Sequence, residues 1–205
     1  MTGSALLVAT RNGAKLRELR PMLQQAGYEP LDLVDAGIAP ALAEAGIEAF
    51  ATFEANAMAK ARYFHRLSGR PTIADDSGLE VDALGGAPGV HSKRWSGKSD
   101  LEGQPLDDAN NARLLLALQP FASRTARYVC VAAFVSGERE LASRGETVGE
   151  ITLEARGDMG FGYDPYFLSH DLGATFGESS LEAKAIVSHR GRAMRALLRE
   201  IAKGR

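Results

Sequence analysis

The stretch Ala5-Leu6-Leu7-Val8-Ala9-Thr10-Arg11-Asn12-Gly13-Ala14-Lys15 joins a short apolar run to a polar segment, and it is the clearest guide to the fold. The run at 5–9 is typical of a short buried strand. Leucines at positions 16, 19 and 23 then follow with helical spacing, which ends near Gly27. Pro21 predicts a kink or a restart in this helix, because proline has no N–H to donate. Residues 5–27 therefore predict a strand, a polar turn and a helix.

Strands and helices continue to alternate along the chain, and a hairpin follows. This pattern predicts an α/β fold, a mixed twisted sheet with flanking helices, in one domain over residues 1–205. The predicted strands are Glu29–Val34, Pro71–Ala74 running into a turn at 75–78, Thr125–Val135, a strand from Glu140 joined to it around Ser136-Gly137, and Thr147–Ala155. The predicted helices are Phe53–Leu67 capped by Thr52, one ending at Leu118 and capped by Asp107 or Asp108, and one after Ser188 that buries Ala193, Leu197, Leu198 and Ile201.

The composition excludes several classes of protein. The 205 residues are 45% hydrophobic and 24% charged, which is the balance of an ordinary globular protein. A net charge of −2 without a basic block disfavours nucleic acid as a partner. The single Cys130 lies in an apolar run and indicates packing, and the four histidines lack zinc spacing. The run at 5–9 is too short for a signal peptide and no stretch predicts a membrane span, so we expect a cytoplasmic protein.

Two polar segments follow predicted strands and suit phosphate and metal chemistry. The turn Thr10–Lys15 opens a helix, whose free N–H groups and dipole attract phosphate, and Lys15 adds a positive charge. It is neither a Walker A loop nor a GxGxxG fingerprint, and taken alone it fits an ordinary helix cap better than a phosphate site. In Asp75-Asp76-Ser77-Gly78, two adjacent carboxylates suit Mg²⁺, one holding metal and the other orienting water. An ordinary turn is the alternative there.

Two later segments suit a nucleobase. In Gly160-Phe161-Gly162-Tyr163-Asp164-Pro165, the glycines permit close approach of a ligand and Phe161 has a face on which a base can stack. A rigid aromatic turn is the alternative. Lys184 has a charge that suits phosphate, and His189-Arg190 offers donors to a base carbonyl. Donors there favour a base that presents a carbonyl oxygen over one that presents an amino group.

Six motifs in order resemble the inosine triphosphate pyrophosphatase family, also called dITP/XTP pyrophosphatases. Any one of them arises easily by chance, whereas six in the right order are specific. They are Ala9-Thr10-Arg11-Asn12 with Lys15, Thr52-Phe53-Glu54 with Asn56-Ala57 and Lys60-Ala61, Ala74-Asp75-Asp76-Ser77-Gly78-Leu79, Gly85-Gly86-Ala87-Pro88-Gly89-Val90, Gly160–Pro165, and Ser188-His189-Arg190-Gly191.

The resemblance implies two lobes around a nucleotide cleft, a homodimer, and Mg²⁺-dependent cleavage of purine nucleoside triphosphates (dITP, ITP, XTP) between the α- and β-phosphates. It implies that Asp76 is general base and metal ligand with Asp75 beside it, and that Lys15 and Lys184 offset the charge of the phosphates. The substrate-binding residues it implies are Thr10, Arg11, Asn12, Gly13, Ala14, Lys15, Ser77, Phe161, Gly162, Tyr163, Asp164, Lys184, His189 and Arg190.

The sequence departs from the family pattern in two places. The further metal-binding glutamate of the family matches Glu48 by its offset, but Glu44 competes because residues 41–51 look altered. Ala55 replaces an acid that often precedes the asparagine. Two rival functions remain: a Maf-type pyrophosphatase acting on other modified nucleotides, and a nucleotide-binding protein without catalysis.

Overall fold

The computed structural model of the protein describes residues 4–137 and 139–204. Within this part of the chain the strands are β1 (Ser4–Val8), β2 (Tyr28–Leu31), β3 (Thr72–Val81), β4 (Thr125–Ser136), β5 (Arg139–Ile151), β6 (Phe167–Ser169) and β7 (Ala174–Thr175). They are hydrogen-bonded in the order β2-β1-β3-β4-β5-β6-β7. β1 pairs in parallel with β2 and β3, whereas β6 pairs antiparallel with β5 and β7. The prediction of a mixed sheet is confirmed.

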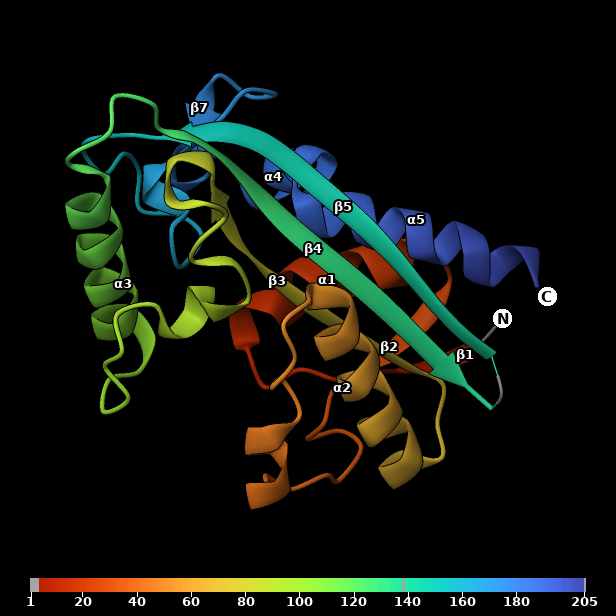
Figure 1. The fold of residues 1–205 in the computed structure, drawn as a ribbon. Coiled ribbons are helices and arrows are strands. Elements are labelled where there is room, and N and C mark those ends of the chain that lie inside the picture. Colours follow the sequence, from red (N-terminus) through yellow and green to blue (C-terminus); the bar gives the residue numbers. More distant parts are fainter. Residues whose placement is uncertain (1–3, 138, 205) are drawn as a thin grey trace. The chain divides into compact units, whose positions relative to one another are not determined.

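The helices have lengths typical of an α/β protein, and each is colour-coded along the chain in Figure 1. They are α1 (Gly13–Gln25), α2 (Phe53–Ser68), α3 (Gly103–Leu118), α4 (Leu181–Val187) and α5 (His189–Lys203). No helix in the described residues is both long and apolar enough to cross a lipid bilayer.

The described residues divide into two compact units. The first unit comprises the described residues of 1–76, 130–145 and 190–205, and the second unit comprises 77–129 and 146–189 with the same restriction. Each of the strands β3, β4 and β5 has residues in both units. Neither unit is therefore a continuous piece of sequence, and a single domain over 1–205 stays a prediction.

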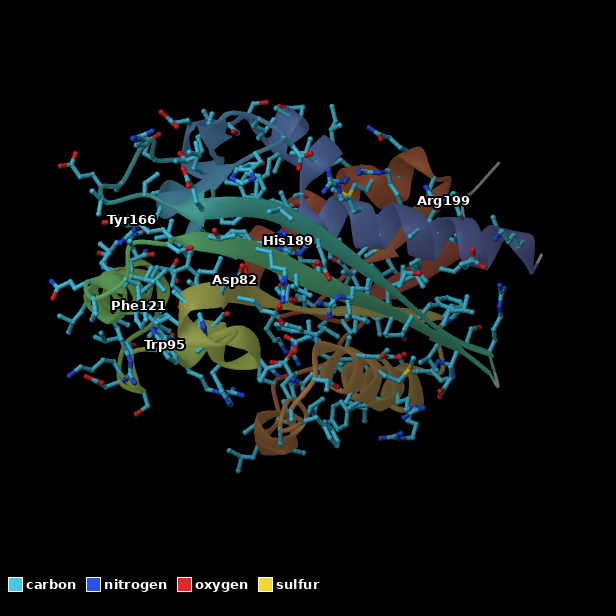
Figure 2. All side chains as sticks on the ribbon, turned by 45° about the horizontal axis from the view of Figure 1, so that its top comes forward. Asp82, Trp95, Phe121, Tyr166, His189 and Arg199 are labelled. Carbon is cyan, nitrogen blue, oxygen red and sulfur yellow. The ribbon has the colours of Figure 1, made fainter. Side chains whose placement is uncertain are left out.

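The core of the first unit lies between its strands and the helices α1 and α5. Side chains alternate along a strand, so Leu6 and Val8 share one face of β1 and pack there with Leu19 of α1 and Leu197 of α5. α2 covers the other side of these strands (Figures 1 and 2). Its N-terminus is capped as predicted, because Thr52 Oγ1 accepts a hydrogen bond from the Ala55 N–H at 3.2 Å.

The core of the second unit lies between α3 and the parts of β3, β4 and β5 that belong to this unit. Leu114 and Leu118 of α3 join a buried cluster with Tyr128 of β4 and Phe167 of β6. Figure 2 shows Trp95 near α3, and the Arg113 guanidinium of that helix lies 4.7 Å from the centre of the indole ring.

The structure corrects four sequence-based predictions of local structure. Pro21 lies inside an unbroken α1, on its exposed side, where water can solvate the carbonyl that proline leaves unbonded. Residues 75–78 continue β3 instead of turning, since strand pairing there outweighs the turn preference of Asp, Ser and Gly. Asp107 and Asp108 lie within α3 rather than at its cap, and the predicted strand at 147–155 is the end of β5, which stops at Ile151.

Candidate active site

The segment Thr10–Lys15 begins α1 as a capped helix start. Asn12 Oδ1 accepts hydrogen bonds from the N–H groups of Ala14 at 2.8 Å and Lys15 at 3.2 Å. Thr10 Oγ1 in turn accepts one from the Asn12 N–H at 3.1 Å. These bonds order the segment that we predicted to hold phosphate, and they place Gly13 as its first helical residue. The helix dipole then adds its positive end at this position.

Arg11 contacts the loop that contains the competing glutamate. Its guanidinium donates to both carboxylate oxygens of Glu44, at 3.1 and 2.7 Å, and to the Ile38 carbonyl at 2.8 Å. The hydrogen bonds from Arg11 hold the pKa of Glu44 below its ordinary value, against the smaller opposing effect of burial. Glu44 is therefore engaged with Arg11, and the choice between Glu48 and Glu44 as the further metal-binding acid stays a prediction.

Asp75 is buried within the first unit and bound by two cations. Its side chain lies on β3 and the residue is 1% exposed. Oδ2 lies 3.0 Å from Lys15 Nζ and 3.1 Å from Arg190 Nε. Burial alone would raise the pKa of this carboxyl, but the positive charges, chiefly those of Lys15 and Arg190, outweigh it and hold the pKa well below the ordinary value. Asp75 is thus ionised at neutral pH.

Arg190 also forms an ion pair with Glu18, a buried acid on α1. Asp75 and Glu18 thereby bind the guanidinium of a residue that is itself 2% exposed. The base-reading role that we predicted for Arg190 would require it to leave these carboxylates. Cys130, the predicted packing residue, is buried with Sγ 3.9 Å from Asp75 Oδ2. Burial raises the pKa of its thiol, so Cys130 is inert as a nucleophile.

Asp76, the predicted general base, has a different environment from Asp75. It is 8% exposed, and its Oδ2 accepts a hydrogen bond from Asn56 Nδ2 at 2.9 Å. Burial raises the pKa of Asp76 above its ordinary value, even though Lys15 and Lys60 oppose the shift. Two neighbouring carboxyls are therefore tuned in opposite directions, which is a common sign of a reactive site.

Glu48 and Lys60 complete the charged cluster of the first unit. Lys60 Nζ forms an ion pair with Glu48 Oε1. The charge of Glu48 contributes to the raised pKa of Asp76, so the two carboxylates interact. Burial alone would raise the pKa of Glu48, but Lys60 and Lys15 outweigh it and hold it below the ordinary value. Among the described residues, no three His, Cys, Asp or Glu side chains converge as a ready-made metal site.

Glu18, Asn56 and Lys60 are the residues of this cluster to which sequence reasoning gave no role. Asn56 and Lys60 lie four residues apart on the buried face of α2, beside Ala57 and Ala61. A polar residue on an otherwise apolar helix face is the signal that would have found them. Glu18 has the same signal on α1, where it lies next to the buried Leu19.

In the second unit the predicted base-binding loop is tightly held. Asp164 Oδ2 accepts hydrogen bonds from the Phe161 N–H at 2.8 Å and from Lys184 Nζ at 2.6 Å. Lys184 is 3% exposed, and its ammonium lies 5.1 Å from the centre of the Phe161 ring. A Cβ on Gly160 would lie 2.2 Å from Asp164 Oδ2, so that position requires glycine. The structure thus brings together Phe161, Asp164 and Lys184.

Two side chains of α3 bind the backbone N–H and C=O groups of Gly162, in the middle of this loop. The Gly162 N–H donates to Asp107 Oδ2 at 2.8 Å, and Asn111 Nδ2 donates to the Gly162 carbonyl at 2.9 Å. The Tyr163 hydroxyl donates to the Ser92 carbonyl at 2.8 Å. These three hydrogen bonds hold the backbone of the loop in place.

His189 belongs to the second unit and stacks on an aromatic ring. Its imidazole lies 4.5 Å from the ring centre of Tyr128 with the planes 8° apart, and Figure 2 labels the residue. Arg190 follows it directly in the chain but binds Asp75 and Glu18 of the first unit. Ser77 lies partly exposed on β3. The role of each predicted substrate contact stays a prediction.

Comparisons with known proteins agree on one family. The sequence model of the Ham1 family matches residues 6–200. A dITP/XTP pyrophosphatase of Syntrophobacter fumaroxidans is 46% identical over 98% of this chain and 83% of its own length. One from Mycobacterium tuberculosis (strain H37Rv) is 48% identical over 94% of this chain and 93% of its own.

Solved structures give the same result. The Staphylococcus aureus Ham1 protein superposes with a TM-score of 0.82 at 30% identity, covering 98% of this chain and 100% of its own. A nucleoside-triphosphatase / dITP/XTP pyrophosphatase from Mycobacterium abscessus gives a TM-score of 0.71 at 41% identity, over 95% of this chain and 98% of its own. By sequence and by fold, this chain belongs to the Ham1 family.

Proposed function

We propose that the protein hydrolyses non-standard purine nucleoside triphosphates (dITP, ITP and XTP) to the monophosphate and pyrophosphate. The observation that carries the proposal is the contrast between Asp75, held as an anion by Lys15 and Arg190, and Asp76, a buried carboxyl with a raised pKa. The similarity to dITP/XTP pyrophosphatases supports the substrate class. Because the chain belongs to the Ham1 family, this activity is favoured over the Maf-type pyrophosphatase considered above.

Asp76 is the proposed general base. A water molecule gives up a proton to the Asp76 carboxylate as its oxygen bonds to the α-phosphorus. The bond between that phosphorus and the oxygen bridging to the β-phosphate breaks, and pyrophosphate leaves with the electron pair. A base works best when its pKa lies near the working pH, so the raised pKa of Asp76 suits this role.

Lys15 is the proposed cation for the phosphates. It lies at the start of α1, where the positive end of the helix dipole also attracts phosphate. Its ammonium lies beside the Asp75 carboxylate. Lys184 has a different role in this proposal: its pairing with Asp164 fixes Phe161 beside it, so it shapes the base site. His189 and the loop 161–164 are the proposed contacts of the base.

The acids of the first unit fit a magnesium ion that arrives with the triphosphate. Mg²⁺ takes one or two protein carboxylates and completes its shell with phosphate and water, so a ready-made group of three acids is not required. Glu48 and Asp76 would hold it. Asp75 Oδ1 is buried and has no hydrogen-bond partner among the described residues, while Oδ2 is bound by cations, so Asp75 has one oxygen to offer. The ion, when bound, would polarise the phosphate oxygens.

A substrate panel tests the proposal. The purified protein is incubated with Mg²⁺ and, separately, with ITP, XTP, dITP, GTP, ATP and dUTP, and pyrophosphate and orthophosphate are both measured. Pyrophosphate with the monophosphate from the first three, and little from GTP or ATP, is the expected result. Orthophosphate would indicate cleavage at the γ-phosphate instead, and tight ITP binding without turnover would favour the non-catalytic rival.

We also propose a homodimer in the cytoplasm that has neither nucleic acid nor membrane as a partner. The net charge of −2 supports the absence of a nucleic-acid partner. Light scattering on the eluting protein would give the mass of the assembly, and a mass near 21.9 kDa would contradict the dimer.

A further inference from the structure

The amide side chain of Asn56 joins two separate parts of the first unit. Its Oδ1 accepts a hydrogen bond from the Phe50 N–H at 2.9 Å. Its Nδ2 donates to the Phe50 carbonyl at 3.2 Å and to Asp76 Oδ2 at 2.9 Å. Both N–H groups of the amide are thus used, and the residue is 1% exposed. The amide is therefore held in one orientation.

These bonds connect the segment that carries Glu48 to the proposed base. Phe50 lies two residues after Glu48, just before α2 begins at Phe53. The segment that carries Glu48 and the strand that carries Asp76 are separate in the sequence, so their relative position depends on an attachment between them. Asn56 provides one, because the same side chain binds the Phe50 backbone and the Asp76 carboxylate.

Asn110 of the second unit offers a comparison in the same molecule. Its Oδ1 accepts from the Ser96 N–H at 2.7 Å and its Nδ2 donates to the Lys93 carbonyl at 3.0 Å. Both asparagines are buried on helices and brace a backbone segment with one amide. The bond to a carboxylate is what distinguishes Asn56. Bracing a loop therefore does not account for the third bond.

We propose that Asn56 is a positioning residue for the hydrolysis, which fixes the Asp76 carboxylate and the Glu48 segment in one arrangement. The inference rests on the role proposed above for Asp76. Misplacing a reacting group by about 1 Å can cost on the order of a hundredfold in rate. Asn56→Ala therefore lowers kcat by roughly tenfold to a hundredfold, with little change in KM, because the binding groups of Lys15 and Phe161 stay in place.

The test compares kcat and KM for ITP in the wild type, Asn56→Ala and the matched control Asn110→Ala. Both variants lose a buried amide, so we expect a similar loss of stability in the two. Circular dichroism checks that each variant folds, and thermal melting measures its stability. A large fall in kcat in Asn56→Ala alone supports the inference. If Asn56→Ala does not fold, Asn56→Ser is used, since its shorter side chain cannot reach Phe50 and Asp76 together.

A double-mutant cycle separates positioning from general damage. In an Asp76→Asn background, assayed at high enzyme concentration, Asn56→Ala lowers the residual rate little further if it acts through Asp76. Hydrogen exchange at the Phe50 amide, which needs no activity, becomes faster in Asn56→Ala. An unchanged kcat in folded Asn56→Ala, or full additivity in the cycle, overturns the inference and leaves the proposed function standing. A wild type that releases no pyrophosphate overturns both.

Discussion

Arg190 Nε lies 3.1 Å from Asp75 Oδ2, although 115 positions separate the two residues in the chain. Asp75 also binds Lys15, and Arg190 also binds Glu18, so positive and negative groups alternate in this buried set. The beginning of α1, the middle of β3 and the beginning of α5 are thereby joined by charge. A buried charge is tolerated only when it is paired, which makes each member depend on the others.

Replacing Arg190 by methionine should destabilise the protein strongly. The change leaves Glu18 and part of the charge of Asp75 buried without a partner, which typically costs about 3–5 kcal/mol in the free energy of unfolding. Urea unfolding followed by circular dichroism measures it. The control is Arg62→Met: Arg62 pairs with Glu140 at 2.5 Å at the surface, where about 0–1 kcal/mol is at stake. Unchanged stability in Arg190→Met with an altered base preference would instead favour the base-reading role.

Acid should reveal the contribution of Asp75 to stability. Its folded pKa lies below its unfolded pKa of about 3.9, so its stabilising effect is complete above that pH and is lost as the pH falls toward the folded value. The free energy of unfolding of the wild type should therefore fall with decreasing pH below about 4. Asp75→Asn, less stable throughout, should show a shallower fall over the same range. If the free energy of unfolding falls in parallel with pH in the two proteins, Asp75 has the same pKa in the folded and the unfolded state.

The sheet and the main helices could be predicted because their patterns are local. The structure has β1 at the apolar run 5–9, α2 directly after the cap at Thr52, and α5 at the helical spacing after Ser188. The turn at 75–78 was predicted wrongly because Asp, Ser and Gly favour turns in isolation, and only pairing with distant strands keeps them extended.

The partners within the site could not be predicted from sequence spacing. Nothing local in Arg190 indicates that it pairs with Asp75 and Glu18, since the contact depends on the packing of α5 beside α1. The choice between Glu48 and Glu44 likewise rested on an offset in an altered segment. In the structure each of the two carboxylates has a cation of its own, Lys60 for Glu48 and Arg11 for Glu44, which the sequence spacing did not indicate.

Glu48→Gln should raise the Mg²⁺ concentration that gives half-maximal activity. The charge of Glu48 acts on the neighbouring Asp76. We expect the required Mg²⁺ concentration to rise roughly tenfold or more, because even the loss of a residue that only supports a metal ligand has an effect of this size. The matched control is Glu44→Gln, whose carboxylate binds Arg11 instead. Equal Mg²⁺ requirements in wild type and Glu48→Gln, or a rise confined to Glu44→Gln, would reverse the assignment.

Asp76→Asn should remove nearly all turnover without unfolding the protein. Asparagine has nearly the same shape, but it cannot take a proton from water, and we expect a loss of more than about a hundredfold in kcat. Pyrophosphate release from ITP measures the rate, and thermal melting checks the fold. Because the folded pKa of Asp76 is raised, ionising it costs stability, so the variant should be at least as stable as the wild type above the raised pKa. Turnover near the wild-type rate would remove Asp76 from the role of base.

Asp107→Ala should weaken substrate binding through the loop that it holds. Its carboxylate accepts the Gly162 N–H at 2.8 Å, and a hydrogen bond to a charged group is typically worth about 1.5–3 kcal/mol. If the loop 161–164 contacts the base, losing this bond should raise KM for ITP by roughly tenfold and narrow the ITP-to-ATP ratio of kcat/KM. The neighbouring Asp108 accepts a hydrogen bond from the Gln104 side chain at 2.8 Å on the surface of α3, so Asp108→Ala is the matched control. An unchanged KM and ratio in folded Asp107→Ala would show that the loop does not contribute to base selection.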